Sequence, residues 1–391
     1  MKSFPVARNI PHVYVAFGLQ AESSRKKLQG VFQYEKEHGP WQIHLEEMPS
    51  RKSLEDFLLH GGDGVLVSSR KFYFYLKDAK IPVVCLDPPQ NLDLPPRHSA
   101  VECDNRAIAR MAYEHLRERG FRHFAFVYDG FHYPWSVERA AFFEEYVRSD
   151  SRNHFYNYGK WSADVQGFAY ASCEQAFFQW LKSLPKPVAI FASIDLMAQR
   201  VLEACFLLGM DVPQEVTVLG VDDTELICTT TKPTLSSIDP GFELGGYLAA
   251  ELLDKMMRGK IRKTRTVRYP PHHVTCRHST QTFLQEDVLI RAALEYIHTH
   301  GEKGATVNST ARFLHVSVRK LEKRFREVVG HTVLEEILNV RFKKVLRLLR
   351  QTDLKLSEIA RQCGLLSETA LNRMFLKRYG ITMNRFRKEK R

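Results

Sequence analysis

Short apolar runs alternate, between residues 12 and 270, with longer segments in which apolar residues recur three and four positions apart. The short runs, bounded by glycine, proline or charged residues, predict buried strands, and the longer segments predict amphipathic helices. Strands are expected at residues 12–17, 42–46, 64–67, 82–86, 124–128, 155–158, 188–191, 216–221 and near 267. Helices are expected at residues 24–37, 54–59, 105–119, 136–147, 166–181, 196–208 and 242–257.

This regular alternation of strands and helices predicts the fold class. Strands that are apolar along their whole length are buried on both faces, as in parallel sheets covered by helices. The series restarts after Gly120, which indicates two similar lobes. We therefore expect a two-lobed α/β domain with parallel sheets, followed by an all-α domain.

The all-α domain is predicted from a pattern that occurs twice, with the second copy 50 positions after the first. Each copy has a serine, a leucine, a phenylalanine, a glycine and a threonine: Ser317, Leu321, Phe325, Gly330 and Thr332, then Ser367, Leu371, Phe375, Gly380 and Thr382. The serine is placed to cap a helix, the leucine and phenylalanine share one helix face, and the glycine stops the helix. With Ala311 and Ala360 shortly upstream, the pattern predicts two helix-turn-helix motifs.

The outward face of the second helix in each copy carries side chains that suit DNA. The candidates are Arg319, Glu322, Lys323, Thr369, Asn372 and Arg373. Arginine and asparagine can read base edges in the major groove, and neighbouring basic residues neutralise phosphates. For a single helix a solvated charged face is the simpler interpretation, but two matched copies on a basic domain favour DNA. Residues 281–391 hold 23 Lys and Arg against 12 Asp and Glu, whereas the preceding residues hold 34 against 33.

Acidic residues follow several predicted strands, at the edge of a sheet where α/β domains bind ligands. Asp104, Asp195 and Asp222 are placed in this way, and Trp135 and Arg139 lie at the start of a helix. Carboxylates and a guanidinium can pair with sugar hydroxyls, and an indole can cover a pyranose ring. Each aspartate could equally be a helix N-cap, and Trp135 could equally be a core residue.

Other features of the sequence argue against several classes of protein. No run approaches 18 apolar residues, so no membrane span and no membrane partner are expected. Seven scattered cysteines fit buried thiols in a reducing cytoplasm. The histidine pairs lack further ligands at metal-site spacing, and no phosphate-binding loop or nucleophile motif is present. We expect no cofactor, no metal and no enzymatic activity.

Residues 283–391 resemble the DNA-binding domain of the AraC/XylS transcription regulators. The resemblance is carried by the two repeated motifs and by Ala360, Cys363-Gly364, Phe375, Lys377, Gly380, Thr382 and Phe386-Arg387. It implies that a helix over residues 333–350 joins the two motifs, which enter successive major grooves of double-stranded operator DNA. The sequence departs from the family pattern at Met383, Leu365 and Leu371, all with apolar residues.

Residues 12–275 resemble the effector domain of the LacI/GalR regulators and the periplasmic sugar-binding proteins. The resemblance is carried by residues 218–225 and 233–238, by Gly120-Phe121-Arg122 with Leu116, and by Ser193-Ile194-Asp195. It implies effector contacts at Asp104, Arg139, Asp195 and Asp222. AraC-type regulators with a LacI-like effector domain are also similar at Arg25 and Trp135, which implies D-xylose or a related pentose as effector.

The resulting hypothesis is a cytoplasmic, sugar-responsive transcription regulator that acts as a homodimer and, as an activator, contacts RNA polymerase. The expected effector domain spans residues 12–276, with lobes of about 12–119 plus 240–262 and 121–236 plus 263–276. A linker is expected at 277–285 and the DNA-binding domain at 286–391. Three alternatives stay open: another effector sugar, a sugar-binding module that binds nucleic acid nonspecifically, and an enzyme acting in the Asp-lined cleft.

Overall fold

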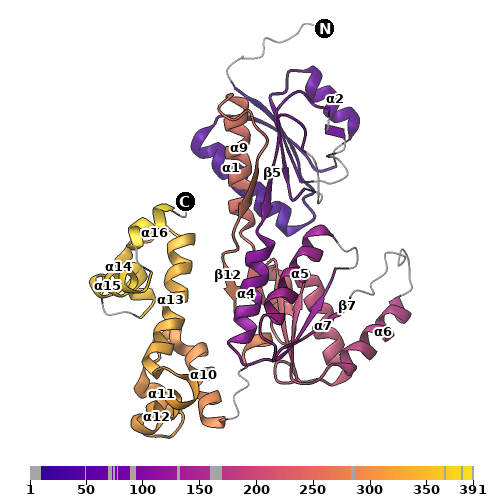
Figure 1. The fold of residues 1–391 in the computed structure, drawn as a ribbon. Helices are drawn as coiled ribbons and strands as arrows, with labels where there is room; N and C mark the ends of the chain where they lie inside the picture. Colours follow the sequence, from indigo (N-terminus) through magenta and orange to yellow (C-terminus); the bar gives the residue numbers. More distant parts are fainter. Residues whose placement is uncertain are drawn as a thin grey trace.

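The computed structural model shows two α/β lobes joined to a helical C-terminal domain (Figure 1). It describes residues 10–48, 50–68, 73, 75–76, 78–88, 94–129, 133–158, 170–282, 287–364, 367–379 and 382–389. None of the helices in these ranges combines the length and apolar character needed to cross a bilayer. The predicted fold class, two parallel-sheet lobes followed by an all-α domain, is confirmed.

The first lobe is built around a parallel six-stranded sheet in the order β11-β5-β4-β3-β1-β2. Its strands are β1 (His12–Ala16), β2 (Gln42–Glu46), β3 (Gly64–Val67), β4 (Val83–Leu86), β5 (His98–Cys103) and β11 (Thr266–Tyr269). Its helices are α1 (Glu22–His38), α2 (Arg51–Leu59) and α9 (Phe242–Met257). Alternate strand residues pack on opposite layers: Val13 and Val15 on the side of α1 and α9, Tyr14 and Ala16 on the side of α2.

The second lobe repeats this plan with a six-stranded sheet in the order β12-β10-β9-β8-β6-β7. Its strands are β6 (His123–Val127), β7 (His154–Tyr158), β8 (Val188–Ala192), β9 (Val216–Val221), β10 (Ser236–Asp239) and β12 (His273–Thr275). Its helices are α4 (Asn105–Arg117), α5 (Pro134–Arg148), α6 (Tyr170–Ser183), α7 (Asp195–Leu208) and α8 (Glu225–Thr230). All of its strands are parallel except β12, which runs antiparallel to β10.

The chain passes between the lobes at three places, and these crossings correct the expected lobe boundaries. After β5 it enters α4, which packs on α5 and belongs with the second lobe, although residues up to 119 were expected in the first. After β10 it returns to the first lobe in α9, and after β11 it enters β12 of the second lobe. Strand β11 was expected in the second lobe but pairs with β5 of the first, because Thr266–Tyr269 extend that sheet in parallel register.

The expected linker is also partly wrong, because its first residues are packed into the second lobe. A short 3₁₀ helix, η1 (His278–Thr280), buries Ser279 and Thr280 completely. The Ser279 hydroxyl donates to the Val218 carbonyl at 2.7 Å, and Arg119 donates to the Thr280 carbonyl at 2.7 Å. These satisfied polar groups anchor residues 277–282 to the effector domain. Residues 283–286 lie outside the described part of the chain.

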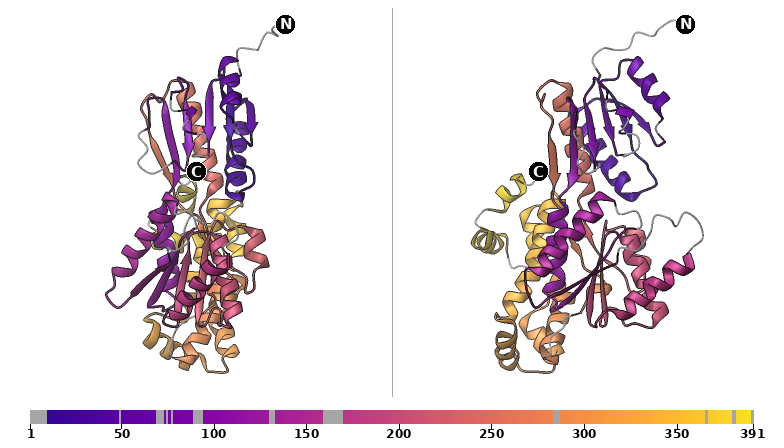
Figure 2. Two further views of the ribbon diagram at one scale, coloured as in Figure 1. Left: turned by 90° about the vertical axis from the view of Figure 1, so that its right-hand side faces the viewer. Right: turned by 45° about the vertical axis from the view of Figure 1, so that its right-hand side comes forward.

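The helical domain contains α10 (Val288–His300), η2 (Gly301–Lys303), α11 (Val307–Phe313), α12 (Val318–Val329), α13 (Val333–Gln351), α14 (Leu356–Gln362), α15 (Glu368–Tyr379) and α16 (Met383–Glu389). It forms two small cores, one around Leu321 and Phe325, the other around Leu371 and Phe375. The duplicated pattern therefore builds two separate helix-turn-helix units joined by α13. Figure 2 shows this domain alongside α4 and the second lobe.

Candidate effector cleft and DNA-reading helices

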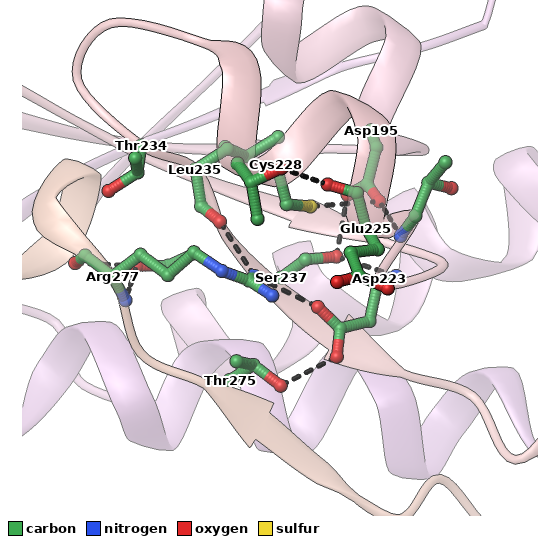
Figure 3. Close-up of polar contacts among 12 residues, drawn as sticks. Asp195, Asp223, Glu225, Cys228, Thr234, Leu235, Ser237, Thr275 and Arg277 are labelled. Carbon is green, nitrogen blue, oxygen red and sulfur yellow. Dashed lines mark hydrogen bonds and ion pairs between the residues drawn. The ribbon is translucent and has the colours of Figure 1, made fainter.

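The carboxylate of Asp195, at the start of α7 in the second lobe, is buried and accepts three hydrogen bonds. It is 1% exposed and accepts hydrogen bonds from the Ser237 hydroxyl at 2.5 Å, the Thr224 amide at 2.8 Å and the Cys228 thiol at 3.4 Å (Figure 3). A Cβ on Gly220 would lie 2.2 Å from its Oδ1, so only glycine admits the carboxylate here. Burial raises the pKa of Asp195 to about 7, against the lowering effect of these donors.

Asp222, at the carboxyl end of β9, differs from Asp195 in its hydrogen bonding. Among the described residues no group hydrogen-bonds its carboxylate, and its backbone has a φ of 112°, in the left-handed region. Burial, followed by the neighbouring Asp195 charge, raises its pKa to about 8. Because three donors favour the ionised form of Asp195, the proton shared by this pair lies on Asp222 at neutral pH. Strain and an unpartnered polar group at one position are typical of a ligand site.

Asp223, the next residue, has a structural role. Its carboxylate forms an ion pair with Arg277 at 2.9 Å and accepts from the Thr275 hydroxyl at 2.6 Å (Figure 3). These contacts tie the β9 end to the last strand of the lobe. The two adjacent aspartates therefore differ: Asp223 is held by Arg277 and Thr275, whereas no described group hydrogen-bonds the Asp222 carboxylate.

Arg139 and Trp135 lie together on the first turns of α5. Arg139 is 4% exposed, and its guanidinium donates to the Asn105 side-chain oxygen at 2.9 Å and to the Ser193 carbonyl at 2.7 Å. It also lies 4.8 Å from the centre of the half-buried Trp135 ring, which stacks on Tyr133. The structure therefore brings Arg139, Trp135, Asp195 and Asp222 to one region.

The two remaining candidates have local roles. Asp104 caps α4, accepting from the Ala107 amide at 2.9 Å, as the N-cap alternative predicted. Arg25 is exposed and donates to the carbonyls of Leu19 and Gln20 at 2.7 and 3.0 Å, which holds the turn between β1 and α1.

Sequence reasoning missed three charged residues of the cleft. Lys27 of α1 is 4% exposed and forms an ion pair with Asp87, which follows β4 at a φ of 51°. Lys26 donates to the backbone carbonyls of Asp222 and Asp223, both at 3.2 Å, and so links the first lobe to the second. The signal for Asp87 was its position directly after an apolar strand, the same signal that singled out Asp222.

The DNA-reading candidates lie on α12 and α15, and their helices begin as the repeat predicted. The Ser317 hydroxyl accepts from the Lys320 amide at 3.2 Å and the Ser367 hydroxyl from the Ala370 amide at 3.1 Å. Gly330 ends α12 with a φ of 86°, while Gly380 lies outside the described residues. Arg319, Lys323, Thr369 and Arg373 are exposed and Asn372 is half-buried. Glu322 is half-buried and accepts from the Val333 amide at 3.4 Å, which directs it toward α13.

Arg341 of α13 connects the two helix-turn-helix units. Its guanidinium donates to the carbonyls of Gly301 at 3.2 Å and Ala305 at 2.7 Å, on the side of the first unit. It also donates to the Gly364 carbonyl at 2.9 Å, in the turn of the second unit. One planar donor thus sets the spacing of both units along α13.

Two family models match this architecture. Residues 113–280 match the periplasmic binding protein-like domain, and residues 310–389 match a helix-turn-helix domain. The first match lies within the two-lobed domain, and the second covers α12 to α16 with most of α11.

Similar proteins share both parts of the chain. The chain is 29% identical over 388 residues to the xylose operon regulatory protein of Haemophilus influenzae, covering 96% of this chain and 97% of that protein. It is 28% identical over 384 residues to the xylose operon regulatory protein of Escherichia coli K12, covering 96% of both. A solved structure of a xylose-binding transcription activator, XylR, superposes with a TM-score of 0.62 at 27% identity, covering 96% of this chain and 97% of the other.

Proposed function

We propose that this chain, a transcription regulator with a periplasmic binding protein-like effector domain and an AraC-type helix-turn-helix domain, responds to D-xylose or a related pentose. The observation that carries the proposal is the Asp222 carboxyl, which has no hydrogen-bond partner among the described residues yet lies beside Arg139 and Asp195. A carboxyl group at a strained backbone position, with no described partner, can form a hydrogen bond with a ligand hydroxyl.

A sugar matches the chemistry of this cleft better than other small ligands do. Carboxyl groups and a guanidinium supply both acceptors and donors, which a ring carrying several hydroxyls can satisfy together. The Trp135 indole beside Arg139 offers an apolar face for the carbon side of the ring. Similar regulators named for the xylose operon support a pentose. Arg25 and Asp104 are included in the proposed effector site because the resemblance to sugar-responsive regulators implies effector contacts at these positions.

The helical domain is proposed to bind double-stranded operator DNA, with Arg319, Lys323, Thr369, Asn372 and Arg373 toward the grooves. The chain would act in the cytoplasm as a homodimeric activator that contacts RNA polymerase, and not as an enzyme. Closure of the lobes on the sugar would change the spacing of the two DNA-binding domains. A sugar shifts this equilibrium only if it binds the closed state more tightly than the open state.

A thermal-shift screen of the purified protein against pentoses, hexoses and purines tests the proposal, with calorimetry on each hit. We expect D-xylose to stabilise the protein and the Asp222→Ala variant to lose that stabilisation, because bound ligand adds to the stability of the folded state. Asp223→Asn serves as a matched control, since Asp223 is already occupied by Arg277 and Thr275. Absence of stabilisation by every sugar would reject the effector assignment.

A footprint on DNA separates specific regulation from nonspecific binding. A regulator protects one preferred sequence, and protection extends over two successive major grooves on one DNA face. Protection without sequence preference would instead make the helical domain a general nucleic-acid-binding module. Turnover of the bound sugar would favour the enzyme alternative.

A further inference from the structure

The two lobes place one aspartate each at equivalent points of their sheets. Strands β4 and β9 are both third in their strand order. Asp87 and Asp222 follow these strands directly and both have positive φ, 51° and 112°. Each amide donates to the neighbouring strand, Asp87 to the Val101 carbonyl at 2.9 Å and Asp222 to the Ile238 carbonyl at 3.0 Å. The equivalence predicts that Asp87 faces the cleft from the first lobe as Asp222 does from the second.

The same equivalence extends to the cations. Helices α1 and α5 follow β1 and β6, which are both fifth in their strand order. Lys27 is the sixth residue of α1 and Arg139 the sixth residue of α5, and each is 4% exposed. Each lobe thus contributes one buried cation and one carboxyl group, although the sequence motifs of the two lobes differ.

The two cation–carboxyl pairs, Lys27 with Asp87 and Arg139 with Asp222, differ in their contacts. Lys27 forms an ion pair with Asp87 through Oδ2, and its ammonium lies 5.0 Å from the centre of the Phe242 ring. The Asp87 side chain keeps 26% exposure, and among the described residues no group hydrogen-bonds its Oδ1. Arg139 instead binds Asn105 and the Ser193 carbonyl, and among the described residues no group hydrogen-bonds the Asp222 carboxylate. The first lobe therefore presents a neutralised carboxylate with one oxygen available to a ligand.

We propose that Lys27 decides the charge class of sugar that the cleft accepts: by neutralising Asp87 it makes the site take uncharged sugars and refuse sugar acids. The inference rests on the proposed function, because it concerns the same effector site. Lys27 acts as a positioning residue that holds Asp87, and Asp87 contacts the ligand through Oδ1.

The physical reason is that a buried charge needs a partner. In the ion pair Lys27 has one, so a ligand carboxylate would lose its hydration without finding an unpaired ammonium at Asp87. When the Asp87 charge is removed, the buried Lys27 ammonium is left unpaired, and a ligand carboxylate becomes its best partner. Burial acts to lower the pKa of Lys27, yet this pKa stays above its usual value, chiefly because of the Asp87 charge.

The test uses D-glucuronate, which has the ring hydroxyl configuration of D-xylose with a carboxylate added at C5, and D-glucose as its uncharged counterpart. Calorimetry with the full-length protein measures the Kd of D-xylose, D-glucose and D-glucuronate for the wild type and for Asp87→Asn. We expect Asp87→Asn to raise the affinity for D-glucuronate relative to D-xylose by at least about tenfold. D-glucose should show no such gain.

The double variant Lys27→Met with Asp87→Asn is the matched control, because it removes both charges of the ion pair and leaves no unpaired ammonium at position 27. Its preference for D-glucuronate should return to the wild-type level, which a general deformation of the cleft would not produce. An unchanged preference in Asp87→Asn, or the same preference in the single and double variants, overturns the inference. A wild type that binds no uncharged sugar overturns the proposed function instead, and cooperative thermal unfolding shows that each variant is folded.

Discussion

Asp195 and Asp222 lie on neighbouring strand ends, and their different hydrogen-bond donors decide which of them holds a proton. Three donors converge on Asp195, whereas Asp222 has none among the described residues. A protonated Asp222 can donate to a sugar oxygen as well as accept from a sugar hydroxyl. At the scale of single residues, the cleft thus offers both kinds of hydrogen-bonding group without adding net negative charge.

The shared proton makes stability depend on pH in a defined direction. Burial raises the pKa of Asp222 to about 8, above its value of about 4 in the unfolded chain. The folded state then binds the proton more tightly, so the stabilisation is complete below about pH 4 and is lost as pH rises through about 8. We expect Asp222→Asn, which cannot ionise, to gain up to about 1.4 kcal/mol per pH unit relative to the wild type across this interval, or several kcal/mol in all.

Urea denaturation at a series of pH values measures this difference in the free energy of unfolding. Asp104→Asn is the matched control, because it removes one carboxyl charge but keeps an acceptor for the N-cap of α4. A difference between Asp222→Asn and the wild type that stays constant with pH would contradict the assignment of the proton to Asp222.

Sequence reasoning located these aspartates but could not assign their roles. Position after a strand predicts a place at the ligand edge of a sheet, and this applies equally to Asp87, Asp195, Asp222 and Asp223. Tertiary contacts decide which role each aspartate has. Arg277, which forms an ion pair with Asp223, lies more than fifty positions away in the chain. Lys27 could not be identified because a lysine in a helix is normally exposed, and only packing shows it to be buried.

At the scale of elements, α13 is the part that gives the DNA-binding domain its geometry. Each helix-turn-helix unit has its own core, so neither core fixes where the other unit lies. The capping box of Thr332 and Glu335 sets where α13 begins. The carbonyls held by Arg341 then set how both units are turned about it.

We expect Arg341→Ala to weaken binding to a complete operator by about 1–3 kcal/mol while leaving binding to a half-operator nearly unchanged. Arg341→Lys should not rescue it, because one ammonium cannot reproduce the fork that reaches three carbonyls. Electrophoretic mobility shifts with full and half sites measure this. Arg373→Ala is the comparison variant: a lost base contact costs about 1–3 kcal/mol on every site that contains that base. Equal losses for Arg341→Ala on full and half sites would rule out a spacing role.

Most elements were predictable from the sequence, and the strands that were missed or misplaced can be explained physically. Periodicity identified the strand Val216–Val221 and the helix Phe242–Met257 with their observed bounds, because long buried segments have strong patterns. Strands β10 and β12 were not recognised, since Ser, Asp, His and Thr fill most of their positions and leave no apolar run. Strand β11 was expected in the wrong lobe because pairing partners are a tertiary property.

At the scale of the whole molecule, α4 connects the cleft with the helical domain. Its first residue, Asn105, is held by Arg139 in the cleft. Near its other end His115 is hydrogen-bonded to Thr280 at 3.0 Å, and Glu118, which follows the helix, forms an ion pair with Lys343 of α13 at 2.9 Å. A rigid helix with one end at the ligand and the other at the DNA-binding domain can carry a displacement between them.

Charge reversal at the Glu118–Lys343 pair tests this route. We expect Glu118→Lys to reduce the effect of sugar on DNA affinity by up to about 1 kcal/mol, because both side chains are largely exposed and such pairs are weak. The double variant with Lys343→Glu should restore it. Operator affinity is measured with and without D-xylose for the four proteins of the cycle. If the double variant did not regain the effect of sugar on DNA affinity, the pair would not transmit the signal.

Attachment of the helical domain to the second lobe constrains how two copies can work together. That domain contacts the end of α4 through Lys343 and Glu118, so the proposed closure of the lobes would move the first lobe relative to it. In a dimer formed through the second lobes, the two DNA-binding domains would keep one separation whether the lobes were open or closed. In a dimer formed through the first lobes, a small closure in each chain would instead change the separation of the two DNA-binding domains along the DNA.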